Sequence, residues 1–192
     1  KVLDGQKVLD IGCGRGEFLA QDPRNFVGVD VDHCLVSQCQ QQGLLAYCMN
    51  AFELEFPDES FDAVHAAQLI EHFSPVEASR FLSEVSRVLR PGGYVYLTTP
   101  GVRAVWNTFS HIRPYPPEAF RKLLGSDTEN YIRASKINLV YENAWGTRFY
   151  FENRAIMFAS SVLDLLVPPR NPIGWTILLR KKFPSAHSTP NT

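Results

Sequence analysis

Near the start of the chain stands the stretch Val8-Leu9-Asp10-Ile11-Gly12-Cys13-Gly14-Arg15-Gly16. Its apolar first half predicts a short buried strand. The three alternating glycines allow a tight turn with little side-chain bulk, so a ligand can lie directly against the main chain. Residues 15–20 can begin a helix whose free N–H groups point toward that ligand. The stretch therefore predicts a strand–turn–helix unit that binds a ligand.

Length, charge and cysteine spacing limit the possible classes of protein. The chain has 192 residues, which is enough for one α/β domain, and we predict a single domain over residues 1–183 with a disordered tail at 184–192. The formal net charge is −1 and there is no long basic run, which makes a nucleic-acid partner unlikely. The four cysteines show no C-x-x-C spacing, so we expect reduced thiols in a cytoplasmic protein. No signal peptide or membrane-spanning run is evident.

Short apolar runs alternate with helical patterns along the chain, which predicts a parallel sheet covered on both faces. The expected strands are residues 7–11, 26–30, 45–48, 61–66, 94–99, 135–142 and 175–182. The expected helices are residues 33–42, 75–89, 117–124 and 154–167. Asp32 and Ser74 precede two of these helices and can cap them.

Four groups of residues follow the predicted strands and should meet at one edge of the sheet. They are the glycine turn, Asp30, Asn50-Ala51-Phe52 and Ala66-Ala67-Gln68. In an open α/β sheet, ligands bind beyond the carboxyl ends of the strands, at the point where the strand order reverses. An acid such as Asp30 can accept hydrogen bonds from both hydroxyls of a ribose, and Asn50 and Phe52 offer an amide and a flat apolar surface to an adenine.

Residues 7–124 resemble the class I S-adenosylmethionine-dependent methyltransferases, in particular their small-molecule branch. The motifs that carry the resemblance, in order, are Val8–Gly16, Val27–Asp30, Asn50–Val64, Leu69–Phe73 and Leu89–Tyr94. The D-x-G-x-G-x-G spacing of the first motif favours S-adenosylmethionine over NAD, whose fingerprint is G-x-G-x-x-G. The resemblance implies a Rossmann-like, seven-stranded, mostly parallel sheet with helices on both faces. It places the core at residues 7–100 and the acceptor-side elements within residues 101–170.

The resemblance also implies which residues bind S-adenosylmethionine and the product S-adenosylhomocysteine. Asp10 would hold the methionine amino group, Asp30 the ribose, and Phe52 one side of the adenine. The implied cofactor-binding residues are Asp10, Gly12, Cys13, Gly14, Asp30, Val31, Asn50, Ala51, Phe52, Ala66 and Gln68. The family more often has an aspartate at the position of Asn50, and an alternative role for this asparagine is a local side-chain-to-backbone turn. The short segment between Gly16 and Asp30 implies a clipped first helix.

Glu71, His72 and His111 are the candidate catalytic residues. Methyl transfer from a sulfonium needs a base only where the acceptor must lose a proton, and an imidazole can take that proton near neutral pH. An alternative is that Glu71 and His72 merely fix the loop. Another is a divalent metal, because Gln68-x-x-Glu71-His72 with a distant histidine resembles small-RNA 2′-O-methyltransferases and some quinone O-methyltransferases. Gln68 puts a neutral amide in place of the first carboxylate, which weakens a hard-cation site, and we assign no metal.

Many aromatic residues between positions 106 and 158 predict an apolar or ring-binding acceptor pocket. We therefore expect a small-molecule, lipid-linked or glycan acceptor, methylated at oxygen. The apolar 154–167 segment could pack on a second subunit or lie on a membrane surface, so a monomer or homodimer and peripheral membrane contact stay open. A non-catalytic protein that binds S-adenosylmethionine as a scaffold or regulator is the main alternative. An oxidoreductase is disfavoured because no Tyr-Lys pair follows the glycine turn.

Overall fold

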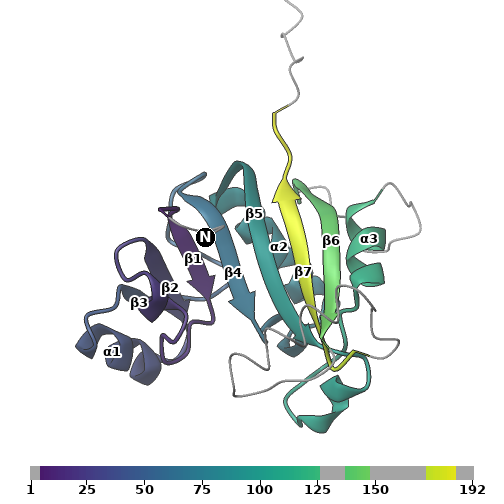
Figure 1. Ribbon diagram of the computed structural model, residues 1–192, viewed down its shortest axis with the longest axis horizontal. Helices are drawn as coiled ribbons and strands as arrows, with labels where there is room; N and C mark the ends of the chain where they lie inside the picture. The colour runs from purple at the N-terminus through teal and green to yellow at the C-terminus, as the bar shows by residue number, and fades with distance from the viewer. Residues whose placement is uncertain (1–4, 126–136, 148–171, 185–192) are drawn as a thin grey trace, which may run out of the picture.

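A seven-stranded sheet forms the centre of the computed structural model, which describes residues 5–125, 137–147 and 172–184 (Figure 1). The strands are β1 Val8–Ile11, β2 Phe26–Asp30, β3 Ala46–Cys48, β4 Phe61–Ala67, β5 Leu89–Pro100, β6 Leu139–Thr147 and β7 Gly174–Lys181. Their order in the sheet is β3-β2-β1-β4-β5-β7-β6. The first five strands are parallel, and β7 is antiparallel to both β5 and β6. The predicted Rossmann-like, mostly parallel sheet is confirmed.

Alternating side chains divide the core between the two faces of the sheet, as the period of two along a strand requires. Leu9 and Ile11 pack on one face with α2 (Pro75–Val88) and α3 (Pro117–Leu124). Val8 packs on the other face, with α1 (His33–Gln41) and the short 3₁₀ helix η1 (Leu19–Gln21). Helices therefore cover both faces, as predicted.

The two predicted N-caps are present, and each sets the first turn of its helix. Asp32 accepts hydrogen bonds from the N–H groups of Cys34 and Leu35, at 2.8 and 3.4 Å. Ser74 and Glu77 form a capping box, in which each side chain binds the backbone N–H of the other. Such caps satisfy N–H groups that have no partner inside the helix. The caps explain why these two helix starts could be located from sequence.

The helix expected after the glycine turn is wrong in extent. Only the three-residue η1 forms there, in agreement with the clipped helix that the short connection implies. Gly14 and Gly16 have φ of 55° and 83°, in the left-handed region, which prevents a right-handed helix from starting at residue 15. Pro23 ends the segment, because a residue before proline is disfavoured in helical conformation, and Asp22 leaves the helical region at φ −149° and ψ 77°.

Two strand boundaries also differ from the prediction. β5 covers Leu89–Pro100 rather than residues 94–99, so it begins directly after α2, and its pairing with β4 is irregular near this start. β6 covers Leu139–Thr147 rather than residues 135–142. The helix predicted over residues 154–167, the aromatic residues at 131 and 149–158, and the tail from residue 185 lie outside the described residues.

Candidate functional site

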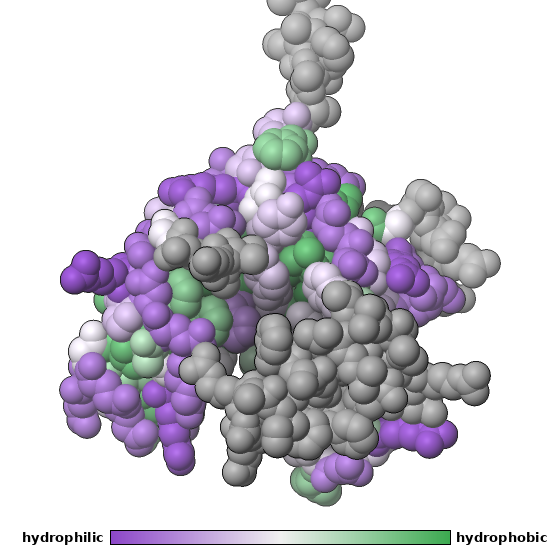
Figure 2. All heavy atoms as spheres, viewed as in Figure 1, coloured by the Kyte–Doolittle hydropathy of each residue, from purple (hydrophilic) through white to green (hydrophobic). Residues whose placement is uncertain are grey.

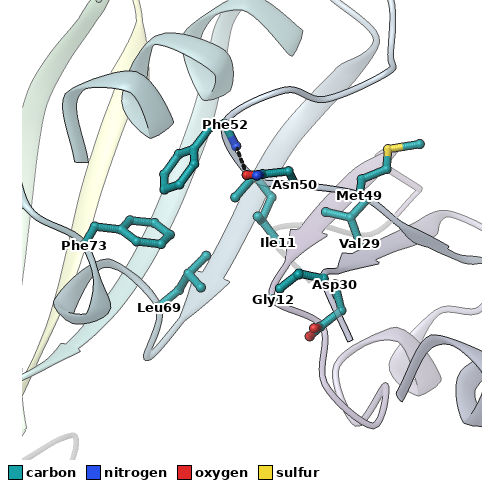
Figure 3. Close-up of a pocket in the computed structure, with 11 residues that line it drawn as sticks. Ile11, Gly12, Val29, Asp30, Met49, Asn50, Phe52, Leu69 and Phe73 are labelled. Atoms are coloured by element: carbon teal, nitrogen blue, oxygen red, sulfur yellow. Dashed lines mark hydrogen bonds between the residues drawn. The ribbon is translucent and has the colours of Figure 1, made fainter. Parts of the chain in front are cut away.

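A cavity of about 280 Å³ lies at the carboxyl ends of β1 and β2 (Figure 3). β2 lies on one side of β1 in the sheet and β4 on the other, so the strand order changes direction at β1. The cavity therefore lies at the topological switch point. The lining residues are Ile11, Gly12, Val29, Asp30, Val31, Met49, Asn50, Ala51, Phe52, Leu69 and Phe73. Six of these were predicted to bind the cofactor: Gly12, Asp30, Val31, Asn50, Ala51 and Phe52.

The glycine turn approaches β2 closely and leaves open space on its outer side. The N–H groups of Gly12 and Cys13 both donate to the carbonyl of Val29, at 2.8 and 3.0 Å. Gly12 and Gly14 have φ of 76° and 55°, a conformation that side-chain-bearing residues rarely adopt. A Cβ at Gly14 would meet no atom within 4 Å. The turn therefore presents bare backbone to open space at Gly14, which does not itself line the cavity.

Asp30 joins the glycine turn to the end of β2. One carboxylate oxygen accepts a hydrogen bond from the N–H of Gly14 at 2.9 Å, and the other accepts from the N–H of Asp32 at 2.9 Å. Each carboxylate oxygen has a second lone pair, so both can still accept a hydrogen bond from a ligand hydroxyl. The side chain can thus order the turn and bind a ribose at the same time.

Phenylalanine rings form the wall opposite Asp30. The rings of Phe52 and Phe73 contact each other with centroids 4.8 Å apart, and Figure 3 shows both on the same side of the cavity. Asn50 accepts a hydrogen bond from the N–H of Phe52 at 2.9 Å, which is the local turn considered as the alternative for this residue. One lone pair of the Asn50 oxygen is used in this way, and its contact with an adenine stays a prediction.

Asp10 lies next to the cavity but is not part of its lining. Its carboxylate is buried and lies 2.7 Å from Nδ1 of His65, the residue directly beside it on β4. The His65 ring stacks on Phe18 with centroids 4.0 Å apart. The sequence analysis missed His65. Only the register of β1 against β4, strands that are neighbours in the sheet but not successive in the chain, reveals this pair.

Cys13, Ala66 and Gln68 also lie outside the cavity lining. Burial raises the pKa of the Cys13 thiol far above its usual range, so the thiol stays protonated and is no nucleophile. Ala66 is buried in the core. Gln68 is exposed at the end of β4, where it adopts φ 52° while its N–H donates to the carbonyl of Thr98 at 2.9 Å. A non-glycine residue held in that conformation is typical of functional sites.

Glu71, His72 and His111 are brought together, although about forty positions separate the first two from the third. Glu71 and His72 belong to the 3₁₀ helix η2 (Ile70–His72), and His111 follows the 3₁₀ helix η3 (Ala104–Asn107). One ligand-type atom from each side chain lies within 4.8 Å of the others. The carboxylate of Glu71 is fully buried and lies 4.0 Å from Nε2 of His111. Burial raises the pKa of this carboxyl above its usual range, and the nearby His111 and His72 oppose the shift without cancelling it.

Backbone hydrogen bonds hold the segment after β5 against η2. The N–H of Ile112 donates to the carbonyl of Glu71 at 2.8 Å, and the hydroxyl of Tyr115 donates to the carbonyl of Phe73 at 2.8 Å. Leu69 and Phe73, on either side of η2, line the cavity. The Glu71–His72–His111 cluster is therefore positioned by the same turn that forms one wall of the cavity.

Five cavity residues were missed by the sequence analysis: Ile11, Val29, Met49, Leu69 and Phe73. All are apolar, and each is next to or within a motif that the analysis singled out. From sequence, these apolar residues look like ordinary core residues. Only the spatial arrangement shows which apolar side chains face a cavity.

Comparison with known proteins agrees with this geometry. Residues 9–97 match the methyltransferase domain family. A phthiotriol/phenolphthiotriol dimycocerosates methyltransferase of Mycobacterium ulcerans is 39% identical over 108 residues, which are 50% of this chain and 38% of that protein. A fatty-acid O-methyltransferase of Mycolicibacterium smegmatis is 37% identical over 105 residues, with the same two coverages. A tRNA (carboxymethyluridine(34)-5-O)-methyltransferase of Arabidopsis thaliana is 32% identical over 96 residues, which are 49% of this chain and 24% of that protein.

The family match over residues 9–97 and the fold of the sheet both indicate a class I S-adenosylmethionine-dependent methyltransferase domain. S-adenosylmethionine is the cofactor of this family. Matched regions span only about a quarter to two fifths of the length of the curated relatives.

Solved structures show how widely this fold is used. An S-adenosylmethionine-dependent methyltransferase from Archaeoglobus fulgidus superimposes with a TM-score of 0.64 and 19% identity, over 91% of this chain and 85% of that one. The [4+2]-cyclase SpnF superimposes with the same TM-score and 20% identity, over 94% of this chain and 76% of that one. The fold alone therefore does not fix the reaction.

Replacing Asp30 tests its predicted role as the ribose acceptor. Asp30→Ala is expected to weaken S-adenosylhomocysteine binding by about 1.5–3 kcal/mol, because hydrogen bonds to a charged acceptor are strong. Asp30→Asn keeps one acceptor oxygen and should lose less. Isothermal titration calorimetry measures both, with Asp22→Asn, an acid in the same β1–β2 connection, as the control. Equal affinity for wild type and Asp30→Ala would show that Asp30 does not contact the ligand.

Replacing Gly14 tests the open side of the turn. Gly14→Val should abolish S-adenosylhomocysteine binding in a folded protein, because the side chain would project into the space above the backbone. Gly43→Val is a matched control, since Gly43 also has a positive φ, 76°, and open space around its Cβ. Both variants carry comparable backbone strain, and circular dichroism monitors folding. Loss of binding in both, or in neither, would contradict a cofactor site at Gly14.

Proposed function

We propose that this chain binds S-adenosylmethionine in the cavity beyond β1 and β2 and transfers its methyl group to an oxygen of a small-molecule or lipid-linked acceptor. The observation that carries the proposal is that a cavity suited to the cofactor lies next to a group of side chains that could accept a proton. The bare glycine backbone, the Asp30 carboxylate and the Phe52 wall suit an adenosine-containing cofactor. Glu71 and His72 lie on the turn between cavity residues Leu69 and Phe73, and His111 packs against them from the loop after β5; an acceptor there could have its proton removed.

Hydrogen bonds prepare the two histidines to take a proton. Nδ1 of His111 lies 2.9 Å from the carbonyl oxygen of Val105, and Nδ1 of His72 lies 3.2 Å from the carbonyl oxygen of Ser110. A carbonyl only accepts, so in the neutral form each Nδ1 carries the proton and each Nε2 keeps a lone pair. In the proposed reaction an acceptor hydroxyl gives its proton to one Nε2 while its oxygen attacks the methyl carbon. The sulfonium then leaves as neutral S-adenosylhomocysteine. Alignment of the two reactants supplies much of the rate.

An exposed apolar loop supports a lipid-linked acceptor. Four large apolar side chains between β5 and α3 face solvent, with exposed fractions of 49% for Val102, 62% for Trp106, 107% for Phe109 and 51% for Ile112. Figure 2 shows a small hydrophobic patch among hydrophilic residues at the lower edge of the molecule, near the teal segment that follows β5 in Figure 1. Because His111 belongs to the same loop, an acceptor extracted from a lipid surface would enter beside the proposed base.

Charge in this loop fits an anionic lipid surface. Residues 101–115 contain Arg103 and Arg113 and no acidic residue. Apolar side chains flanked by cationic ones are typical of segments that bind membrane surfaces. Across the part of the chain that the structure describes, none of the helices is both long and apolar enough to cross a bilayer. Phthiotriol dimycocerosates and fatty acids, named for two of the relatives, are lipids. A cytoplasmic location and a monomeric or homodimeric state stay predictions.

The main alternative is a protein of this family that binds the cofactor without transferring a methyl group. The likeness to the [4+2]-cyclase keeps this alternative open. It would preserve the cavity but give the Glu71–His72–His111 cluster no role in turnover.

Methyl transfer can be measured directly with S-adenosylmethionine labelled in its methyl group and a panel of fatty acids, hydroxylated lipids and bulk tRNA. We expect label in a lipid fraction. With the active acceptor, His111→Ala should lower turnover by about 10²–10⁴-fold, the usual contribution of a general base, while S-adenosylhomocysteine affinity stays unchanged. His33→Ala, a change at an exposed histidine on α1, is the control. Labelled tRNA with unlabelled lipid would contradict the acceptor class, and turnover unaffected by His111→Ala would contradict the base.

Vesicle binding tests the exposed loop. Trp106→Ser with Phe109→Ser should lower the partition coefficient onto phosphatidylserine-containing vesicles by about 10-fold or more, since burying either side chain contributes about 1.5–3 kcal/mol. Phe183→Ser removes another exposed ring, 64% accessible, at the opposite edge of the sheet and serves as the control. Sedimentation with vesicles measures the partition. Equal loss in the control, or no loss in the double variant, would exclude this loop as the membrane contact.

A further inference from the structure

The carboxylate of Glu71 is fully buried and has no hydrogen-bond partner for either oxygen among the described residues. The hydroxyl of buried Thr99 likewise has no partner there. Leaving a polar group unpaired in a protein interior costs free energy, and leaving a charge unpaired costs far more. The Thr99 hydroxyl can also donate a hydrogen bond, whereas an ionised Glu71 carboxylate only accepts. Its buried oxygens therefore indicate a missing cationic or proton-donating group.

Two imidazoles belong to the same group as Glu71, and each has one ring nitrogen that no backbone carbonyl occupies. Backbone carbonyls occupy Nδ1 of His72 and of His111, so Nε2 of each ring is left as a potential ligand. This is the usual second shell of metal-binding histidines, in which one ring nitrogen is fixed by a hydrogen bond while the other binds the ion. The rings contact each other edge to face, with centroids 4.7 Å apart. The ligand-type atoms of Glu71, His72 and His111 lie within 4.8 Å of one another.

We propose that Glu71, His72 and His111 bind one divalent transition-metal ion of the Zn²⁺, Fe²⁺ or Mn²⁺ class. Two imidazole nitrogens and one carboxylate form the donor set that such ions accept, with coordination positions left open, whereas Mg²⁺ and Ca²⁺ prefer oxygen ligands alone. Ligand atoms around such an ion lie about 3–3.5 Å apart, at metal–ligand distances of about 2.0–2.2 Å. Small side-chain rotations would close the observed group to that size.

This proposal revises the assignment made from sequence. Gln68 argued against a metal there because it puts an amide in the place of a first carboxylate. In the structure Gln68 is exposed, its side-chain amide donates to the hydroxyl of Thr98 at 3.4 Å, and it is not a member of the group. The three ligands are complete without it. The Gln68 amide argues only against a site for a hard cation such as Mg²⁺ or Ca²⁺, which is bound by oxygen atoms.

Metal binding does not depend on methyl transfer. If the proposed function holds, the ion would replace the histidine base, because an Nε2 that binds a metal has no lone pair left to accept a proton. An ion here would lie on the turn that carries cavity residues Leu69 and Phe73. A hydroxyl bound at an open position has a lowered pKa, so the ion would help the acceptor lose its proton. Without a metal, the competing explanation is an ion pair between Glu71 and a protonated His111, whose 4.0 Å separation is at the limit for such a contact.

The test uses the untagged full chain, stripped with a chelator and titrated with Zn²⁺ and with Mn²⁺ in a calorimeter. We expect one equivalent of at least one of these ions to bind and to raise the melting temperature. His72→Ala, His111→Ala and Glu71→Gln should each weaken binding by at least about 10-fold. His33→Ala and Glu55→Gln, changes at exposed residues outside the group, should bind like wild type. Absence of binding in folded wild type, or equal binding by the His111 and His33 variants, would overturn the proposal.

The melting temperature and the S-adenosylhomocysteine affinity of the same samples distinguish failure of the metal site from failure of the proposed function. In the metal-free protein, Glu71→Gln should melt at or above the temperature of wild type, because an unpaired buried charge is removed. A lower melting temperature would instead support the Glu71–His111 ion pair and contradict the metal site. S-adenosylhomocysteine affinity, measured on the same samples, should be unchanged in every variant. Intact cofactor binding without metal binding would refute this inference alone, whereas loss of cofactor binding in wild type would refute the proposed function.

Discussion

The carboxylate of Asp30 and the carbonyl of Val29 hold the glycine turn in a left-handed conformation, and the candidate cofactor site depends on that constraint. Together they accept hydrogen bonds from Gly12, Cys13 and Gly14. The turn leaves β1 toward β2 with bare backbone facing outward, which only glycine allows at these positive φ values. The glycine turn and the Asp30 carboxylate are therefore parts of the same local structure, so ligand binding and the geometry of the turn are coupled.

A second constraint builds the other half of the site from distant segments. The carbonyl of Glu71 anchors the chain after β5, and this places His111 beside Glu71 and His72. The cluster is therefore positioned by backbone hydrogen bonds and by the contacts of the two histidine Nδ1 atoms with backbone carbonyls, which leave Nε2 of each ring open. Its buried, unpaired carboxylate is a cost to stability, and natural proteins accept such costs mainly at functional sites.

Local rules account for what sequence could predict. Strand runs, the caps at Asp32 and Ser74, and the order of the motifs gave the sheet, its helices and the six predicted residues that line the cavity. The rest depends on pairings that no local pattern encodes. The Asp10–His65 contact needs the register of β1 against β4, and the Glu71–His111 contact needs the path of a loop. Only the 3₁₀ helix η1 forms after Gly16, as the short connection to Asp30 implied, because backbone conformation at the glycines outweighs the helical pattern that follows.

The central claim is that the glycine turn, Asp30 and the Phe52 wall form a site for an S-adenosyl ligand rather than for a dinucleotide. Calorimetric titration of the wild-type chain with S-adenosylhomocysteine, and in parallel with NADH, tests it most directly. The account predicts a dissociation constant in the micromolar range for S-adenosylhomocysteine, about 8 kcal/mol of binding free energy, and no heat of binding for NADH. Binding of NADH with no binding of S-adenosylhomocysteine would contradict it.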